Sequence, residues 1–413
     1  MGRFLLFVEP FLLIISDWHA GGKTPAVNMI RKEVRILHYL DHAATTPVPE
    51  AVAQAMMDVL TGQFGNPSTQ YPLGQQAKAM VDGWRATVAG ALGCPKERLF
   101  FTSCGTESDN WAIHAAVWQG RHVGKHIIST SVEHNAILEH LKFLEQNGYE
   151  VTYLKPDRTG HVTVDQVAAA LREDTVLVCM MLVNNETGCV FPVEETAKLL
   201  RERKSRALFL CDAVQGFLKV PCDPVGWGVD FMSLSGHKIG GPKGVGALYI
   251  TPNLRNPRPL LPGGGQESGL RSGTEATAQI AGFAKAVEVR CDHLQEKLEK
   301  MAELKEYCLQ QLKTIDTLVE TVHGEAPQVL SVSLPGYPSA NIVSDLGAKG
   351  ICVSAGSACH KGKASHVIAA LGLPKRTAAG VIRISFGPET TKEDVDALVA
   401  ALREHKEKRF PML

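Results

Sequence analysis

A short segment in the middle of the chain carries residue types that covalent catalysis uses. In "SLSGHKIGGPKGVG", residues 233–246, Lys238 follows an apolar, β-rich run and is surrounded by glycines. A lysine amine that is partly removed from water has a lowered pKa, so it can form a Schiff base or transfer a proton. Taken alone, the segment is also typical of a solvated turn between two strands. Other parts of the chain must decide between these interpretations.

Four further β-rich runs end in polar or small residues of unusual kinds. The residues that follow these runs include Gly105, Thr106, His134, Asn185 and Asp212. Because ligands bind outside the carboxyl ends of strands in open α/β sheets, these endings predict one composite site. Amides near Gly105 would lie at a helix N-terminus, where an anion binds. Taken one at a time, these residues are equally typical of helix caps, structural histidines or a paired carboxylate.

The combination of an amine, an anion cradle, an acid and a flat ring surface suits pyridoxal 5′-phosphate (PLP). Lys238 would form the Schiff base, and Asp212 would keep the pyridine nitrogen protonated. Ser235 and His237 would help to hold the phosphate. Two nucleotide motifs are incomplete: a P-loop that starts at Gly236 fails, and "GGGQESG" does not give G-x-G-x-x-G.

Length and composition are those of an ordinary globular protein. Of its 413 residues 45% are hydrophobic, and 43 basic residues balance 43 acidic ones. No overall field favours nucleic acid or an anionic membrane, so we expect a small, neutral or zwitterionic substrate. The ten cysteines include no C-x-x-C pair. This argues against zinc or disulfide frameworks and is typical of a reducing compartment, so we expect a cytoplasmic protein without a metal site.

From Met29 onward, β-rich runs alternate with helical patterns, which predicts an α/β fold with a mostly parallel central sheet flanked by helices. Residues 1–28 do not match this pattern. Their apolar stretch "RFLLFVEPFLLII" resembles a short signal segment, but Glu9 and Pro10 interrupt it and it is too short to span a bilayer. We interpret residues 1–28 as an N-terminal extension outside the fold and not as an export signal.

A series of short motifs extends over most of the chain. It runs from "YLDHAATTP" (39–47) through "FGNPST", "TSCGTESDN", "SVEHNA", "VNNETG", "DAVQ", "SLSGHK", "GGGQESGLRSGT" and "VSAGSACHKG" to "IRISFG" (382–387). In this order the motifs resemble those of cysteine desulfurases in the class-V aminotransferase family. The resemblance implies a PLP-dependent transferase of fold type I. Residues 45–285 would form its large PLP-binding domain, and residues 29–44 and 286–413 a smaller α+β domain.

The same resemblance implies roles for the residues around the cofactor. Lys238 would be the catalytic attachment point, Asp212 would pair with the pyridine nitrogen, and the catalytic His134 would stack on the ring. The other expected contacts are Gly105, Thr106, Ser235 and His237 at the phosphate, and Asn185 and Gln215 near the substrate and the ring's 3′-oxygen. Thr274, in "LRSGT", would reach the phosphate of the neighbouring subunit, which makes a homodimer part of the site.

Two further residues would act on the substrate, L-cysteine. Arg383, in "VIRISFG", would bind its carboxylate in a bidentate pair, with a structural salt bridge as the alternative. Cys359 has basic neighbours that favour a thiolate. By the resemblance it receives the substrate's sulfur as a persulfide and L-alanine is released. The sulfur would then serve iron–sulfur cluster assembly or other biosynthesis through a sulfur-acceptor protein of unknown identity.

Two alternatives to a cysteine desulfurase stay open from the sequence. A selenocysteine lyase would share the cofactor site and also carry a cysteine in the loop around residue 359. A noncatalytic sulfur carrier or PLP-binding module is the more remote alternative, because Lys238, Asp212 and Cys359 are all present.

Overall fold

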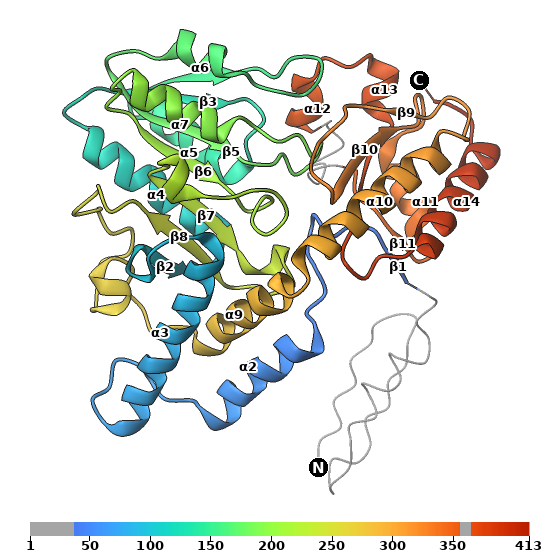
Figure 1. The fold of residues 1–413 in the computed structure, drawn as a ribbon. Helices are drawn as coiled ribbons and strands as arrows, with labels where there is room; N and C mark the ends of the chain where they lie inside the picture. Colours follow the sequence, from blue (N-terminus) through green and yellow to red (C-terminus); the bar gives the residue numbers. More distant parts are fainter. Residues whose placement is uncertain (1–36, 356–364, 413) are drawn as a thin grey trace, which may run out of the picture. The chain divides into compact units, whose positions relative to one another are not determined.

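A seven-stranded sheet forms the centre of the computed structural model, which describes residues 37–355 and 365–412 (Figure 1). The strand order is β2-β8-β7-β6-β5-β3-β4. The strands are β2 (Leu99–Thr102), β3 (His126–Thr130), β4 (Glu150–Leu154), β5 (Thr175–Met181), β6 (Leu208–Asp212), β7 (Phe231–Ser235) and β8 (Gly246–Ile250). Only β8 runs antiparallel to its neighbours. The predicted mostly parallel α/β sheet is therefore confirmed.

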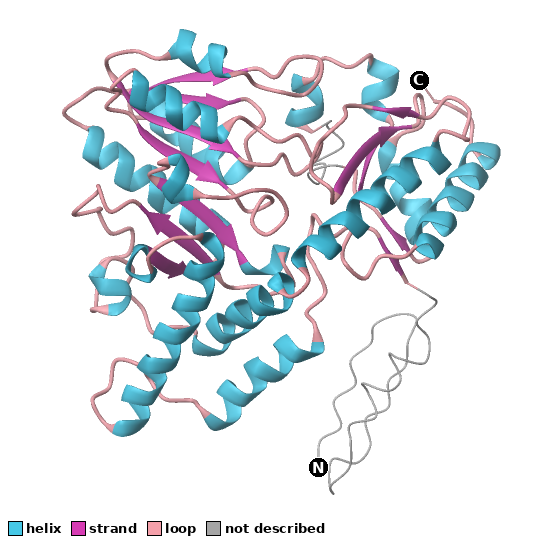
Figure 2. Ribbon diagram, viewed as in Figure 1, coloured by secondary structure: helices cyan, strands magenta, loops and turns pink. Residues whose placement is uncertain are grey.

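Most strands of this sheet are buried along their whole length. Every residue of β3, β5, β7 and β8 is buried. Continuous burial, instead of burial of alternate residues, is what a strand needs when helices cover both faces of its sheet. Figure 2 shows these strands in magenta with cyan helices on both sides.

The helices that accompany the central sheet come from the first three quarters of the chain. They are α2 (Glu50–Gly62), α3 (Pro72–Leu92), α4 (Gly105–Gly120), α5 (Asn135–Gln146), α6 (Val164–Ala170), α7 (Val193–Glu202), α8 (Pro224–Trp227) and α9 (Thr277–Cys291), with the 3-10 turns η1 (Lys96–Arg98), η2 (Gly236–Lys238) and η3 (Gln266–Gly269). Local sequence sets some of their ends. α3 begins with Pro72 and stops at Gly93, whose φ of 76° suits a residue without a side chain.

A second, separate core lies in the C-terminal third of the chain. It packs around a three-stranded antiparallel sheet in the order β12-β10-β9, and β1 pairs in parallel with β11. Its elements are β1 (His38–Tyr39), α10 (Leu294–Leu312), β9 (Val319–Glu320), β10 (Val329–Ser333), α11 (Ser339–Gly347), β11 (Ile351–Cys352), α12 (His366–Ala370), α13 (Lys375–Ala379), β12 (Val381–Ser385) and α14 (Lys392–Lys408). Leu40 packs into this core beside Ile384 and Leu398.

Two predictions from the sequence concern the domain boundaries and the first 28 residues. The domain boundaries at residues 45 and 285 stay a prediction, and residues 1–28 lie outside the described residues. No helix in residues 37–355 or 365–412 is long and apolar enough to cross a lipid bilayer.

Candidate active site

Neighbouring strand ends bring the predicted acid and amine to one edge of the central sheet. Asp212 is the last residue of β6 and lies in register with Ser233 of β7. Lys238 follows three residues after the end of β7, in the turn η2. Because parallel strands end at the same edge of a sheet, both side chains reach the same region of the molecule.

The ammonium group of Lys238 is held by backbone carbonyls from the start of the described chain. Its Nζ donates to Ala43 O at 2.7 Å and to Ala44 O at 2.8 Å. Burial, aided by the charge of Arg383, lowers the pKa of Lys238 to about 8, while Asp41 and Asp212 oppose this shift. This amine can therefore lose its proton close to neutral pH, which an exposed lysine cannot do.

Asp212 is buried, with 5% of its surface exposed. Burial raises its pKa, whereas nearby His134, the Val214 amide and Lys238 lower it. Its Oδ1 accepts a hydrogen bond from Val214 N at 2.9 Å. These neighbours favour the negative charge at Asp212, which is what a partner of a protonated pyridine nitrogen requires.

Two more carboxyl groups lie buried behind Asp212. Burial raises the pKa of Asp109 well above its ordinary value, and the charge of Asp212 raises it further. Burial likewise raises the pKa of Glu133 to about 8. Lys238 lies near Asp212 and lowers the pKa of Asp212, whereas no cation among the described residues acts on Asp109 in this way. The negative charge therefore concentrates on Asp212, the acid that has a cationic neighbour.

The N-terminus of α4 lies against the same strand ends. A Cβ added to Gly105 would lie 2.7 Å from Val214 Cγ2 and 3.6 Å from Ser235 Cβ. This contact distance leaves no room for a side chain, so the glycine permits the helix amides to approach β6 and β7. Thr106 follows in the first turn and is exposed. Free amides and a hydroxyl at a helix N-terminus provide donors for a phosphate.

His237 and His134 are oriented by their own hydrogen bonds. His237 Nδ1 lies 3.1 Å from Thr45 Oγ1, and burial beside Lys238 lowers its pKa to about 4. The ring is therefore neutral near pH 7 and can donate to a phosphate from one nitrogen. His134 is the N-cap of α5, and its Nδ1 accepts a hydrogen bond from Ala136 N at 3.2 Å.

Arg383 takes part in an ion pair within the chain. Its Nη2 donates to Asp41 Oδ1 at 2.8 Å and its Nη1 donates to Asn185 O at 2.8 Å. The salt bridge that the sequence left as an alternative is thus present, and a substrate carboxylate would have to compete with Asp41. Gln215 reaches the same region, where its Nε2 donates to Ala43 O at 2.9 Å.

One predicted residue, Thr274, is not brought into this cluster. Thr274 is exposed in the loop between η3 and α9 and makes no hydrogen bond with the described cluster residues. Cys359 lies outside the described residues. The described residues on either side of it are attached to the site region: Ser354 N donates to Arg383 O at 3.1 Å, and Ser365 Oγ donates to Glu186 Oε1 at 2.8 Å.

Sequence reasoning assigned no role to several residues that the structure places in the site. Asp41, Thr45 and the carbonyls of Ala43 and Ala44 all come from "YLDHAATTP". This segment served only to support the resemblance, and its position far from Lys238 in sequence gave no sign of contact. Within residues 37–355 and 365–412 no group of three or more metal-binding side chains is arranged to hold an ion.

Known proteins are similar in sequence to most of this chain. Residues 38–398 match the family described as aminotransferase class-V. The chain belongs to the class-V aminotransferase family. Among curated relatives, "Cysteine desulfurase IscS" of Methanosarcina thermophila is 39% identical over 372 residues, which cover 89% of this chain and 91% of the relative. "Cysteine desulfurase" of Trichormus azollae is 41% identical over 371 residues, covering 89% and 92%.

Solved structures of class-V aminotransferase relatives share the fold. A "NIFS-LIKE PROTEIN" superposes with a TM-score of 0.85 at 35% identity, covering 90% of this chain and all of that one. A structure described as "SspA in complex with cysteine" has a TM-score of 0.74 at 31% identity and covers 86% of this chain and 99% of that one. Members of this family depend on PLP in general.

Proposed function

We propose that the protein is a PLP-dependent cysteine desulfurase that converts L-cysteine into L-alanine and transfers the sulfur to its own Cys359. The observation that carries the proposal is Lys238: an amine with a pKa lowered to about 8, positioned at a strand end beside the buried Asp212 in a class-V aminotransferase fold. We place this activity in the cytoplasm, as the cysteine usage predicts.

The residues of the site fit PLP. Gly105 lets the N-terminus of α4 pack closely against Val214 and Ser235, so the first amides of α4 would reach a phosphate together with Ser235 and His237. Asp212 would pair with the pyridine nitrogen and His134 would lie on the ring. When bound, PLP supplies an electron sink for the bonds of the substrate's α-carbon.

The chain's own residues then bind the substrate and move protons. Lys238 Nζ can accept a proton from the α-carbon and return it, because its pKa lies near neutrality. Arg383 would bind the substrate carboxylate in place of Asp41, and a planar guanidinium can hold either carboxylate with two hydrogen bonds. Asn185 and Gln215, which follow the neighbouring strands β5 and β6, would orient the substrate from the same edge of the sheet.

Sulfur transfer would use Cys359. Its thiolate attacks the substrate's sulfur atom, an S–S bond forms, and the bond between that sulfur and the β-carbon breaks. The β-carbon takes up a proton and becomes the methyl group of alanine, so one cysteine yields one alanine and one persulfide. The anchored residues Ser354 and Ser365 support this role, because both ends of the segment carrying Cys359 are tied to site residues.

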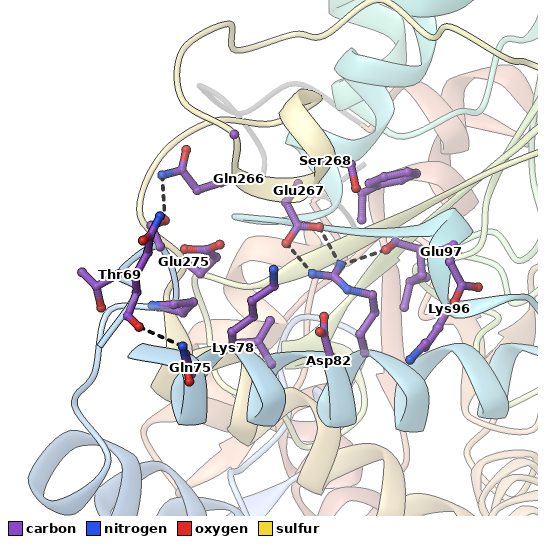
Figure 3. Close-up of a pocket in the computed structure, with 18 residues that line it drawn as sticks. Thr69, Gln75, Lys78, Asp82, Lys96, Glu97, Gln266, Glu267, Ser268 and Glu275 are labelled. Atoms are coloured by element: carbon purple, nitrogen blue, oxygen red, sulfur yellow. Dashed lines mark hydrogen bonds and ion pairs between the residues drawn. The ribbon is translucent and has the colours of Figure 1, made fainter. Parts of the chain in front are cut away.

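We further propose a homodimer in which Thr274 completes the partner's phosphate site. A cavity of about 1000 Å³ lies between α3 and the loop of residues 265–275, which contains Thr274. Figure 3 shows Lys78 and Asp82 projecting from α3 toward Glu267 in this loop. Exposed Met57, Leu60, Phe64 and Tyr71 lie on α2 and the segment that follows it. A hollow beside apolar side chains supports contact with a second copy.

The decisive experiment is a turnover assay on purified, PLP-loaded protein. With L-cysteine we expect equimolar alanine and sulfide in the presence of a thiol reductant, and a persulfide on Cys359 when reductant is left out. A Cys359→Ser variant should bind PLP normally but release no sulfur. A parallel assay with selenocysteine separates this function from that of a selenocysteine lyase, for which turnover of cysteine would be negligible. The partner that accepts the sulfur can be sought by following transfer of the labelled persulfide.

A further inference from the structure

Three cationic or potentially cationic side chains lie buried together behind the candidate active site. His42, Lys219 and Arg290 are 6%, 5% and 6% exposed. Burial and the mutual repulsion of these groups lower the pKa of His42 to about 4 and the pKa of Lys219 well below its ordinary value. At neutral pH the positive charge of this cluster is therefore that of the buried Arg290, because burial and repulsion favour the neutral forms of His42 and Lys219.

None of the three is paired with an acid within the described residues. Lys219 Nζ makes one long hydrogen bond, 3.4 Å, to Gln215 Oε1. Arg290 Nη2 contacts only Met301 Sδ, at 3.7 Å, and Arg290 Nε and His42 Nδ1 have no hydrogen-bond partner there. An arginine stays charged at any physiological pH, so burial without a partner costs free energy that another group has to offset.

A cavity of about 60 Å³ adjoins this cluster. His42 and Arg290 line it, together with Lys297 and the exposed Glu389, and the remaining lining is mostly apolar or backbone. A water molecule takes up roughly 30 Å³, so the cavity has room for one small ion together with water. The lining side chains carry two positive charges and one negative charge, which favours an anion over a cation.

Glu389 acts on the charge of Arg290 but does not neutralise the cluster. It raises the pKa of Arg290 without forming an ion pair with it, and burial still lowers that pKa to about 10. Glu389 is exposed, so water screens its charge. The unbalanced charge therefore remains on the buried side of the cavity, at Arg290, next to His42 and Lys219.

We propose that this cavity is a binding site for a small monovalent inorganic anion of the size of chloride, with Arg290 as its principal ligand. The site lies directly behind the candidate active site, because Lys219 contacts Gln215 and the Gln215 amide shares the acceptor Ala43 O with Lys238. The inference does not depend on the proposed desulfurase activity, since it concerns residues that touch neither the expected cofactor nor the substrate.

Bromide is a suitable probe because it resembles chloride and can be located by anomalous diffraction. In crystals of the PLP-loaded protein grown with sodium bromide, we expect an anomalous peak in the cavity beside Arg290. In solution, the melting temperature should rise with sodium bromide and saturate, relative to sodium gluconate at equal ionic strength, since gluconate is too large to enter. A map without a peak at this position would overturn the proposal.

Matched variants test which charge is responsible. Arg290→Met should lose the saturable bromide response, whereas Arg255→Met, which removes an exposed arginine elsewhere, should keep it. Glu389→Gln should lower the half-saturating bromide concentration roughly five-fold, because it removes a competing negative charge near the protein surface. If Arg290→Met does not fold, the bromide titration of Glu389→Gln and the anomalous map of the wild-type protein still test the proposal. The assignment would be contradicted if Glu389→Gln responded to bromide in the same way as wild type. It would also be contradicted if Arg290→Met did so.

Discussion

At the scale of single residues, the position of Lys238 distinguishes it from the other lysine in its segment. Lys238 has two carbonyl partners and a lowered pKa, whereas Lys243 is exposed. Both lysines follow the same glycine-rich pattern, so only their surroundings separate a reactive amine from a solvated one. Burial makes the neutral form of Lys238 accessible, and a neutral amine is the nucleophile.

Lys238→Ala should abolish covalent attachment of PLP. The variant protein should still bind PLP reversibly, since the phosphate and ring contacts remain, but borohydride treatment should label no peptide. Mass spectrometry of digested protein measures this directly. Lys243→Ala is the control and should be labelled like wild type. A borohydride-reducible adduct retained in Lys238→Ala would show that another amine carries the cofactor.

Glu133 should make the protein's stability depend on pH. Its pKa is raised from 4.5 to about 8, so the folded state keeps a proton that the unfolded state releases between these values. Stability should therefore fall as pH rises through this range, by up to about 1.4 kcal/mol per pH unit. In Glu133→Gln the acceptor for Thr130 and Met181 persists while the charge is lost, so the slope should become shallower by the contribution of Glu133.

Urea unfolding at several pH values between 5 and 8 measures the effect of Glu133. Glu173→Gln, at an exposed glutamate, should leave the wild-type slope unchanged. A Glu133→Gln protein with the same pH dependence as wild type would mean that Glu133 is ionised in the folded state.

At the scale of elements, the approach of α4 to the ends of β6 and β7 would build the proposed phosphate site. Four residues from three segments meet there: Gly105, Val214, Ser235 and His237. The helix is 16 residues long, and the first amides of such a helix have no partner within it. Their proximity to Lys238 explains why an anionic cofactor and an amine can share one site.

Gly105→Ala should weaken PLP binding and also destabilise the fold. The new Cβ would meet Val214 Cγ2 at 2.7 Å, so α4 must shift away from the strand ends. We expect a loss of about 1–3 kcal/mol in unfolding free energy from overpacking, and at least roughly ten-fold weaker PLP binding. Equilibrium dialysis measures the affinity for PLP, and thermal melts of the apoprotein measure the loss of stability.

Gly90→Ala is the matched control for this substitution. Gly90 also lies in a helix, but a Cβ added there would meet no other atom within 4 Å, so the change should leave PLP affinity unaltered and slightly stabilise α3. Equal PLP affinity in Gly105→Ala and wild type would show that the helix N-terminus does not hold the phosphate.

At the scale of the whole molecule, the proposed dimer has a consequence for mixed subunits. If Thr274 acts on the partner's phosphate site, a heterodimer of Lys238→Ala and Thr274→Asp subunits has one site with both changes and one site with neither. Its activity should be roughly half that of wild type, although each variant homodimer is inactive or severely impaired. Differently tagged, co-expressed subunits allow the heterodimer to be purified and assayed with L-cysteine.

The heterodimer also tests the contrary arrangement, in which Thr274 acts on the phosphate site of its own subunit. If Thr274 served its own subunit, each site of the heterodimer would carry one change and the heterodimer would be as inactive as the two homodimers. A protein that elutes as a monomer in light-scattering chromatography while turning over L-cysteine would also contradict the shared site.

The division of each subunit into a large and a small domain remains a prediction that limited proteolysis can test.

The sequence by itself was sufficient for the fold class and for placing the candidate residues at the ends of the central strands. Continuous apolar runs of β-forming residues indicate buried parallel strands, and the polar residues directly after them lie at one edge. Lys238 and Asp212 were predictable for this reason: a residue's place at a strand end depends only on its local neighbours. The order of the short motifs along the chain indicated the family.

Only the tertiary structure decided which distant groups contact these residues. Ala43 lies 195 residues before Lys238, and Asp41 lies 342 residues before Arg383. Their contacts arise because β1 pairs with β11, while Ser385 at the end of β12 accepts a hydrogen bond from His42 N. No local pattern encodes such pairings. The same holds for the pKa values, since the burial of Lys238, Glu133 and Arg290 results from packing between segments that are far apart in the sequence.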